Sequence, residues 1–196
     1  MGMLVDGKWT DDDGLSRGSG GKFDHLPTFF RSSIEAEGIS RFSAEPDRYH
    51  LYVTKTCPWA HRAILFRHLK GLTGVVGLQV GRHGEQGYRF DATGPHKVPG
   101  TDAQITYLHE LYSLAEPSYT GRVTVPSLWD SKEKTIVNNE SSEIIRMLNG
   151  EFNAFASNKY DYYPEALRQE IDTINDLVYD SVNNGVYKAG FSSNQT

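Results

Sequence analysis

The fold is decided by the stretch Tyr49-His50-Leu51-Tyr52-Val53-Thr54-Lys55-Thr56-Cys57-Pro58-Trp59-Ala60-His61. Its first six residues are rich in β-formers and predict a short strand. Beyond Cys57, apolar residues recur at helical spacing, and Gly71 and Gly74 predict where that helix stops. The cysteine therefore lies at a strand-to-helix turn. Pro58 suits the first helical turn, because no hydrogen-bond donor is lost there.

This position favours a reactive cysteine. The N–H groups of the first helical turn and the positive end of the helix dipole stabilise a thiolate. The alternative is a small buried core residue, as a free cysteine often is, but a core residue needs neither the preceding strand nor the helix start. A nucleophile pair with His61, four residues on, is disfavoured because such partners normally come from distant segments.

Cys57 is also the one cysteine of the chain, and the position three residues later is Ala60. The chain therefore has no internal resolving thiol, so a mixed disulfide on Cys57 needs an outside thiol. Glutathione is the abundant cytosolic candidate. This favours a monothiol enzyme that uses glutathione over a thioredoxin-type dithiol reductase.

Composition narrows the remaining classes. With 196 residues and 38% hydrophobic content, the chain can bury one full domain and part of a second. One cysteine excludes a disulfide framework and a cysteine-based zinc site, and we expect no metal. A formal charge of -5 argues against nucleic acid or an anionic membrane as partner. No apolar run approaches the roughly 18 residues of a membrane span, and no signal peptide is evident, which predicts a cytoplasmic location.

Four zones follow along the chain. Residues 1–48 predict an N-terminal arm, 49–150 a domain of alternating strands and helices, 151–163 a linker, and 164–196 the beginning of a helical domain. Within the second zone we expect a strand over 75–80 joined by a parallel crossover, an irregular stretch over 81–101, and a helix over 105–115. A proline-interrupted strand over 122–129, a hairpin partner over 135–137 and a helix starting at 139–142 complete it.

The fourth zone carries one long amphipathic helix. Its apolar stripe consists of Leu167, Ile171, Ile174, Val178 and Val182. Such a stripe needs a partner surface.

The order of strand, helix, strand, helix, antiparallel hairpin and helix is thioredoxin-like, with the cysteine after the first strand. Four blocks add specificity: Cys57-Pro58-Trp59-Ala60-His61-Arg62, Arg122-Val123-Thr124-Val125-Pro126, Asn139-Glu140-Ser141 and Asn183-Asn184-Gly185-Val186-Tyr187-Lys188-Ala189-Gly190-Phe191. Together they closely resemble the S-glutathionyl-hydroquinone reductases, the Xi class of glutathione transferases. The likeness covers nearly the whole chain. It implies an α/β fold, in which a thioredoxin-like N-terminal domain precedes the start of an all-helical glutathione transferase C-terminal domain that this chain leaves incomplete.

The resemblance also implies binding roles. Val125, before a proline that is cis in this family, would present its backbone to the cysteinyl amide of glutathione. An X-Pro bond is the one peptide bond in which cis costs little, about 0.5 to 1 kcal/mol. The carboxylate of Glu140 would meet the ligand ammonium. Ser141 and its helix N-terminus would take the ligand carboxylate.

Three further positions carry open alternatives. Arg122 is a candidate for the glycyl end of glutathione, or else a solvated strand residue. Tyr88 stands where the family usually has Trp; it can stack and donate a hydrogen bond, but with a different reach. Tyr187 matches the family tyrosine that hydrogen-bonds the quinol oxygen, the alternative being an aromatic packed in a loop.

The implied reaction is removal of glutathione from a glutathionyl-hydroquinone through a mixed disulfide between Cys57 and glutathione, releasing hydroquinone and oxidised glutathione. We expect a homodimer. An omega-type glutathione transferase acting on dehydroascorbate or protein mixed disulfides would share Cys57, Val125, Glu140 and Ser141, but not the block around Tyr187. A non-enzymatic interaction module of the same fold is the second alternative.

Overall fold

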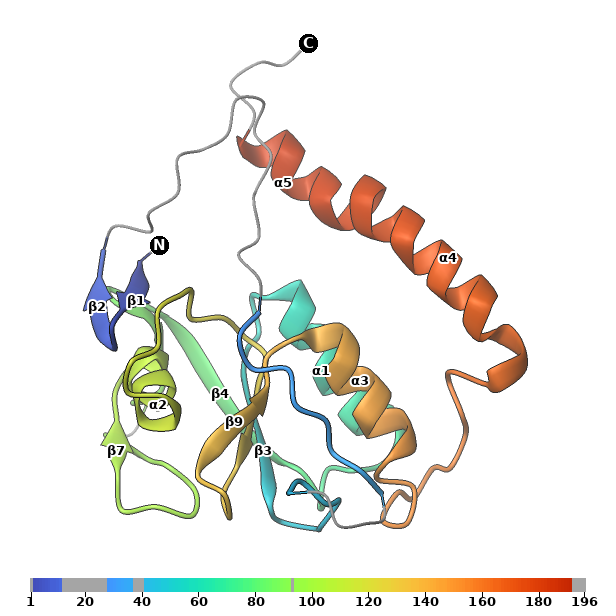
Figure 1. Ribbon diagram of the computed structural model, residues 1–196, viewed down its shortest axis with the longest axis horizontal. Helices are drawn as coiled ribbons and strands as arrows, with labels where there is room; N and C mark the ends of the chain where they lie inside the picture. The colour runs from blue at the N-terminus through green and yellow to red at the C-terminus, as the bar shows by residue number, and fades with distance from the viewer. Residues whose placement is uncertain (1, 12–27, 37–40, 93, 192–196) are drawn as a thin grey trace. The chain divides into compact units, whose positions relative to one another are not determined.

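The computed structural model describes residues 2–11, 28–36, 41–92 and 94–191 (Figure 1). Contacts divide them into two units. The first holds the described residues up to Tyr160, and the second holds those from Asp161 onward.

A five-stranded sheet in the order β5-β4-β3-β8-β9 forms the centre of the first unit. Its strands are β3 (Tyr49–Thr54), β4 (Gly77–Gly84), β5 (Gly87–Arg89), β8 (Ser127–Asp130) and β9 (Thr135–Asn138). β3 and β4 are parallel, while the other neighbouring pairs are antiparallel. Two short hairpins stand apart from this sheet: β1 (Met3–Val5) with β2 (Lys8–Thr10), and β6 (His96–Lys97) with β7 (Gln104–Ile105).

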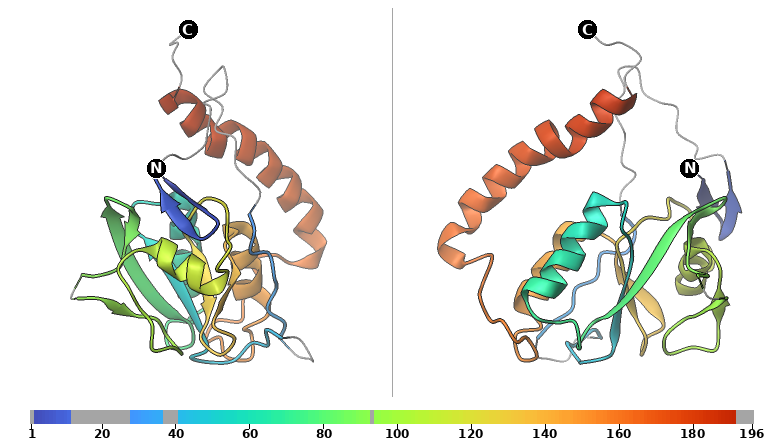
Figure 2. Two further views of the ribbon diagram at one scale, coloured as in Figure 1. Left: turned by 60° about the vertical axis from the view of Figure 1, so that its left-hand side comes forward. Right: turned by 180° about the vertical axis from the view of Figure 1, so that it is seen from behind.

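Three helices cover the sheet: α1 (Pro58–Leu69), α2 (Leu108–Ala115) and α3 (Ser141–Gly150). α1 and α3 pack together on one face, and α2 lies on the other (Figures 1 and 2). The core between these layers includes the fully buried side chains of Leu51, Val53, Leu111, Trp129 and Leu148. This arrangement confirms the predicted thioredoxin-like fold.

The strand over 49–54, the helix that follows it, the parallel crossover and the antiparallel hairpin are confirmed. The prediction of an irregular stretch over 81–101 was wrong, because β4 continues to Gly84 and turns into β5. That hairpin is polar, so it lacks the apolar alternation by which strands are recognised. The strand expected over 122–129 begins only at Ser127, after Pro126, whose ring nitrogen offers no ladder donor.

The described part of the N-terminal arm is attached at several points. Leu4 and Gly121 exchange backbone hydrogen bonds of 2.9 Å in both directions, which ties the β1–β2 hairpin to the segment before β8. Arg31 pairs with Glu143 on α3. The arm therefore contacts both the segment before β8 and α3.

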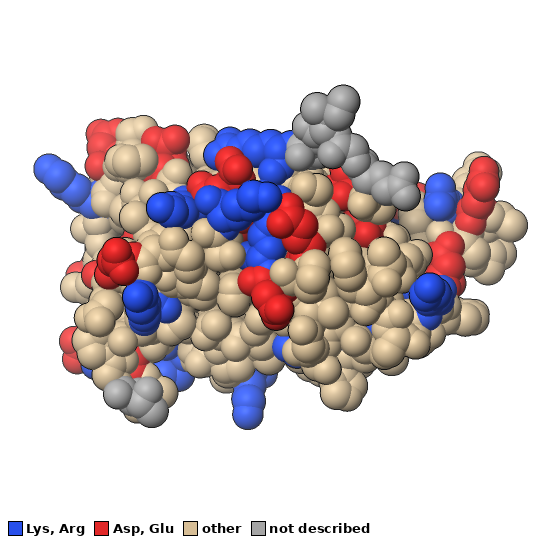
Figure 3. All heavy atoms as spheres, turned by 90° about the horizontal axis from the view of Figure 1, so that it is seen from below, with Lys and Arg blue, Asp and Glu red and all other residues tan. Residues whose placement is uncertain are grey.

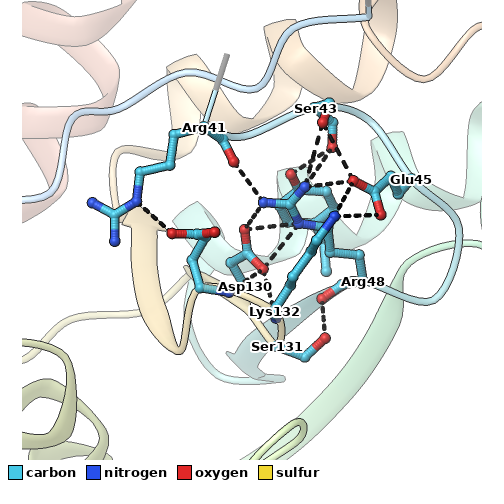
Figure 4. Close-up of polar contacts among 9 residues, drawn as sticks. Arg41, Ser43, Glu45, Arg48, Asp130, Ser131 and Lys132 are labelled. Carbon is cyan, nitrogen blue, oxygen red and sulfur yellow. Dashed lines mark hydrogen bonds and ion pairs between the residues drawn. The ribbon is translucent and has the colours of Figure 1, made fainter. Parts of the chain in front are cut away.

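A buried ion pair lies at the end of the sheet where β3 begins (Figure 4). Arg48 is 4% exposed and Asp130 is fully buried, with Arg48 Nη2 2.6 Å from Asp130 Oδ2. Arg48 Nη1 also donates to Glu45 Oε1 at 2.7 Å. Arg48 thus joins the arm to the β8–β9 hairpin.

On the molecular surface, acidic and basic side chains lie intermixed on the face seen from below (Figure 3).

The second unit is a run of consecutive helical segments: η1 (Glu165–Leu167), α4 (Arg168–Val178), the π-helical η2 (Tyr179–Asn183) and α5 (Asn184–Phe191). No side chain of α4 is buried, and the stripe residues Leu167, Ile174 and Val182 are exposed. Within the second unit the predicted apolar stripe is therefore present, with Ile171 and Val178 half-buried. Across all the residues that the structure describes, no helix has the length and apolar character needed to cross a membrane.

Candidate active site

Cys57 is the N-cap residue of α1. Its backbone is extended, with φ of -97° and ψ of 116°, and Pro58 follows in the first turn. The thiol is partly exposed and donates to the carbonyl oxygen of Val125, with 3.5 Å between Sγ and O. His61 is exposed, and its backbone N–H donates to the Cys57 carbonyl at 2.9 Å as part of the helix. The predicted strand-to-helix position of the cysteine is confirmed.

The segment opposite Cys57 is held by a buried polar network. The Val125–Pro126 peptide bond is cis, and both residues are buried. Tyr112, on α2, donates from its hydroxyl to the Thr124 carbonyl at 2.9 Å. Burial raises the pKa of the Tyr112 phenol, which keeps that donor protonated. Asn139 Nδ2 donates to the Tyr112 hydroxyl at 3.1 Å and to Thr124 Oγ1 at 3.2 Å. The Thr124 residue that precedes Val125 is therefore held by Tyr112 of α2 and by Asn139 just before α3.

Glu140 and Ser141 form the N-terminus of α3. Glu140 is the N-cap residue, and its Oε1 accepts from the backbone N–H of Ser142 at 3.2 Å and from the Ser142 hydroxyl at 3.0 Å. Ser141 is buried. A capping carboxylate, a hydroxyl and the N–H groups of a first helical turn thus meet at one point. Such a point can receive a ligand with both an ammonium and a carboxylate.

Arg62 joins α1 to this point. Its Nε and Nη2 donate to Ser141 Oγ at 3.0 and 2.7 Å, and its Nη2 lies 3.8 Å from Glu140 Oε1. The guanidinium carbon lies 4.7 Å from the centre of the Trp59 ring. Burial lowers the pKa of Arg62 from its ordinary value, while the Glu140 carboxylate opposes the shift, and the guanidinium remains charged at neutral pH. From the sequence, Arg62 has no role beyond its place in the first block. Its contact with Ser141 was missed.

Tyr88 lies near the other side of the cysteine turn. It is on β5, with its ring centre 5.2 Å from that of His83 on β4. His83 Nε2 is in turn 3.1 Å from the hydroxyl of Thr56, the residue before Cys57. Arg122 is half-buried and precedes β8 rather than standing within a strand, and its carbonyl accepts from the Tyr119 hydroxyl at 2.7 Å.

The first unit thus brings Cys57, Val125 and Pro126 together, and places Glu140 and Ser141 on the helix beside α1. Tyr187 lies on α5 and belongs to the second unit. No group of three or more His, Cys, Asp or Glu side chains that could hold a metal occurs among the residues the structure describes. The arrangement supplies a partly exposed thiol, a backbone carbonyl and a charged pair at a helix start.

Comparison with known proteins agrees with this geometry. Residues 56–151 match the family Glutathione S-transferase, N-terminal domain. The whole chain is 47% identical to the glutathionyl-hydroquinone reductase YqjG of Escherichia coli over 203 residues, and covers 62% of it. It is 45% identical over 200 residues to the glutathionyl-hydroquinone reductase PcpF of Sphingobium chlorophenolicum, and covers 61% of it.

A solved structure shows that the likeness extends to the fold. The Xi-class glutathione transferase of Natrialba magadii superposes on the whole chain with a TM-score of 0.82 and 42% sequence identity, the match covering 59% of that protein. The chain thus spans about three fifths of the length of the relatives it matches. The sequence blocks, the fold and these likenesses place the chain in the Xi class of the glutathione transferases.

Proposed function

We propose that this protein is a glutathione-dependent reductase that removes glutathione from glutathionyl-hydroquinones. One observation carries the proposal: the one cysteine of the chain starts a helix, partly exposed, beside the carbonyl of Val125. The reductase names of two relatives above 40% identity support the choice of substrate class.

The binding part of the proposal uses four residues. The Val125 backbone pairs with the cysteinyl amide of glutathione, which brings the glutathione sulfur next to the Cys57 thiol. The α-ammonium of the γ-glutamyl group pairs with Glu140. Its carboxylate meets Ser141 and the first turn of α3. The support is the contact between Cys57 and Val125, together with the capped and partly buried N-terminus of α3.

Arg122 and Tyr88 complete the proposed glutathione site. Arg122 would take the glycyl carboxylate, because a guanidinium binds carboxylates with two parallel donors. Tyr88 would donate to the peptide from the β5 side. Its indirect link to the cysteine turn through His83 and Thr56 supports that placement.

The reaction proceeds in two displacements. The Cys57 thiolate attacks the sulfur of the conjugate, which forms a Cys57–glutathione disulfide and breaks the bond between sulfur and the aromatic carbon. That carbon leaves with the bonding electron pair and takes up a proton. A second glutathione thiolate then attacks the mixed disulfide and frees Cys57. One conjugate and one glutathione therefore give one hydroquinone and one oxidised glutathione.

Tyr187 has its place in the first displacement. A phenolic hydroxyl that donates to the quinol oxygen stabilises negative charge on that oxygen, which carries the charge when the ring reacts through its keto form. This role rests on the match of the block around Tyr187 to the family pattern. A homodimer and a cytoplasmic location are also part of the proposal. The exposed apolar stripe of the second unit supports a homodimer. The need for reduced glutathione supports a cytoplasmic location.

Turnover on two substrates tests the proposal. The protein should release hydroquinone from a glutathionyl-hydroquinone in the presence of glutathione, and do so faster than it reduces dehydroascorbate. The reverse preference would indicate an omega-type transferase. Absence of turnover on both, together with retained glutathione binding, would support a non-enzymatic module. The Cys57→Ser variant is the control for background chemistry, since a hydroxyl is a far poorer nucleophile at neutral pH.

A further inference from the structure

Arg62 has no assigned role in the reaction proposed above, yet its contacts converge on the proposed ligand site. It projects from α1, five residues after Cys57, and directs two N–H groups at the single oxygen of Ser141. The same guanidinium stacks over Trp59, which limits its freedom to move away.

The two hydrogen bonds fix the direction of the Ser141 hydroxyl. A serine oxygen has two lone pairs and one O–H donor. Both lone pairs are used by Arg62, at 3.0 and 2.7 Å. The hydroxyl hydrogen must therefore point away from Arg62. Ser141 is left with a donor for an incoming acceptor and little capacity to accept.

The carboxylate of Glu140 lies beside Arg62 but makes no hydrogen bond to it. The 3.8 Å between Arg62 Nη2 and Glu140 Oε1 is too long for a hydrogen bond. The Glu140 carboxylate instead accepts from Ser142, at its Oε1, and from the Thr28 hydroxyl at 3.4 Å, at its Oε2. With 31% and 32% of their side chains exposed, Arg62 and Glu140 can each meet a ligand charge of opposite sign.

From these contacts we propose that Arg62 is a positioning residue for glutathione, which orients the Ser141 hydroxyl toward the α-carboxylate of the γ-glutamyl group and adds a positive charge beside it. The inference rests on the proposed glutathione site. It divides recognition between two neighbouring charges, with Arg62 serving the ligand carboxylate and Glu140 serving the ligand ammonium. A role confined to holding α1 against α3 would show no such division.

Binding of three probes separates these possibilities. The probes are S-methylglutathione, its analogue with 4-aminobutanoyl in place of γ-glutamyl, which lacks the α-carboxylate, and its analogue with glutaryl, which lacks the α-ammonium. The methylated sulfur prevents disulfide chemistry, so calorimetry reports binding alone. Arg62→Gln should weaken S-methylglutathione binding roughly ten- to a hundredfold, the usual effect of losing a hydrogen bond to a charged group.

The pattern across the probes decides the outcome. The carboxylate-free analogue should bind Arg62→Gln and the unaltered protein within about twofold, while the ammonium-free analogue should keep most of its dependence on Arg62. Arg62→Lys should lie between, because a lysine keeps the charge but not the two parallel donors. The matched control is Arg67→Gln on the same helix, where Arg67 donates to the carbonyls of Val76 and Thr73 at 2.6 and 2.7 Å. Arg67→Gln should not weaken the binding of any one probe relative to the others.

Equal weakening of all three probes in Arg62→Gln would overturn the inference and assign Arg62 a structural role. The inference would also be overturned if Arg62→Gln weakened binding of the carboxylate-free analogue but not of the ammonium-free analogue. That pattern would indicate that Arg62 acts through Glu140. If the unaltered protein binds none of the probes, the proposed glutathione site itself fails, which is a different result from either.

Discussion

Replacing Asp130 by alanine should destabilise the first unit by about 3–5 kcal/mol, the usual effect of leaving one partner of a buried ion pair uncompensated. The Asp130 carboxylate accepts from Arg48 Nε at 3.0 and 2.9 Å and from Nη2 at 2.6 Å. It also accepts from the backbone N–H groups of Lys132 and Glu133 at 2.8 and 3.1 Å. Removing it leaves a guanidinium that is 4% exposed and whose one remaining charged partner, among the residues described by the structure, is the partly exposed Glu45.

The loss is a large fraction of the roughly 5–15 kcal/mol by which a typical domain is stable. Urea unfolding followed by tryptophan fluorescence should detect it, because Trp129 is fully buried on the same strand. Glu133→Gln is the control: it breaks a pair with Arg41 whose side chains are 61% and 32% exposed, and should cost less than about 1 kcal/mol. A loss below about 1 kcal/mol in Asp130→Ala would show that the folded state does not depend on the buried Arg48–Asp130 pair. Asp130 pairs with Tyr49 at the start of β3, and Cys57 lies beyond the far end of that six-residue strand, which is about 20 Å long. Cys57 should therefore keep its reactivity in the folded fraction.

Two further predictions concern the surroundings of the site. The hydrogen bond from Arg31 lowers the pKa of Glu143 below its ordinary 4.5, so this carboxylate stabilises the folded state above that pH and loses the effect as the pH falls through the lowered value. Glu143→Gln should therefore flatten the dependence of the midpoint of thermal unfolding on pH below about 4.5, and an unchanged acid limb would contradict this. Asn139→Ala should cost about 1–3 kcal/mol in urea unfolding, because it removes a buried donor to Tyr112 and Thr124. It should also weaken S-methylglutathione binding, and an unchanged stability would show that the network is dispensable.

The local elements of the fold could be predicted from the sequence because their signals are local. The β-formers before Cys57 and the proline after it define the turn in a dozen residues. The capping residues at the start of α3 do the same for Glu140. The β4–β5 hairpin could not be recognised in this way, because its residues are polar and its pairing depends on an exposed edge of the sheet.

Contacts between distant segments were the part that could not be predicted. Arg48 and Asp130 are 82 residues apart, and no pattern in either neighbourhood indicates the other. The same holds for Arg62 and Ser141, 79 residues apart, whose meeting depends on how α1 packs against α3. The resemblance to a family identified Ser141 as a candidate from its motif, but a motif does not specify which side chain orients it.

The most direct test of the central claim is the intact mass of the protein after mixing with a glutathionyl-hydroquinone in the absence of free glutathione. Each reacted chain should gain one glutathionyl group on Cys57 and release one hydroquinone, and added glutathione should then remove the group as oxidised glutathione. The Cys57→Ser variant should gain nothing. Release of hydroquinone while Cys57 stays unmodified, or a glutathionyl group that appears equally in Cys57→Ser, would show that Cys57 is not the nucleophile.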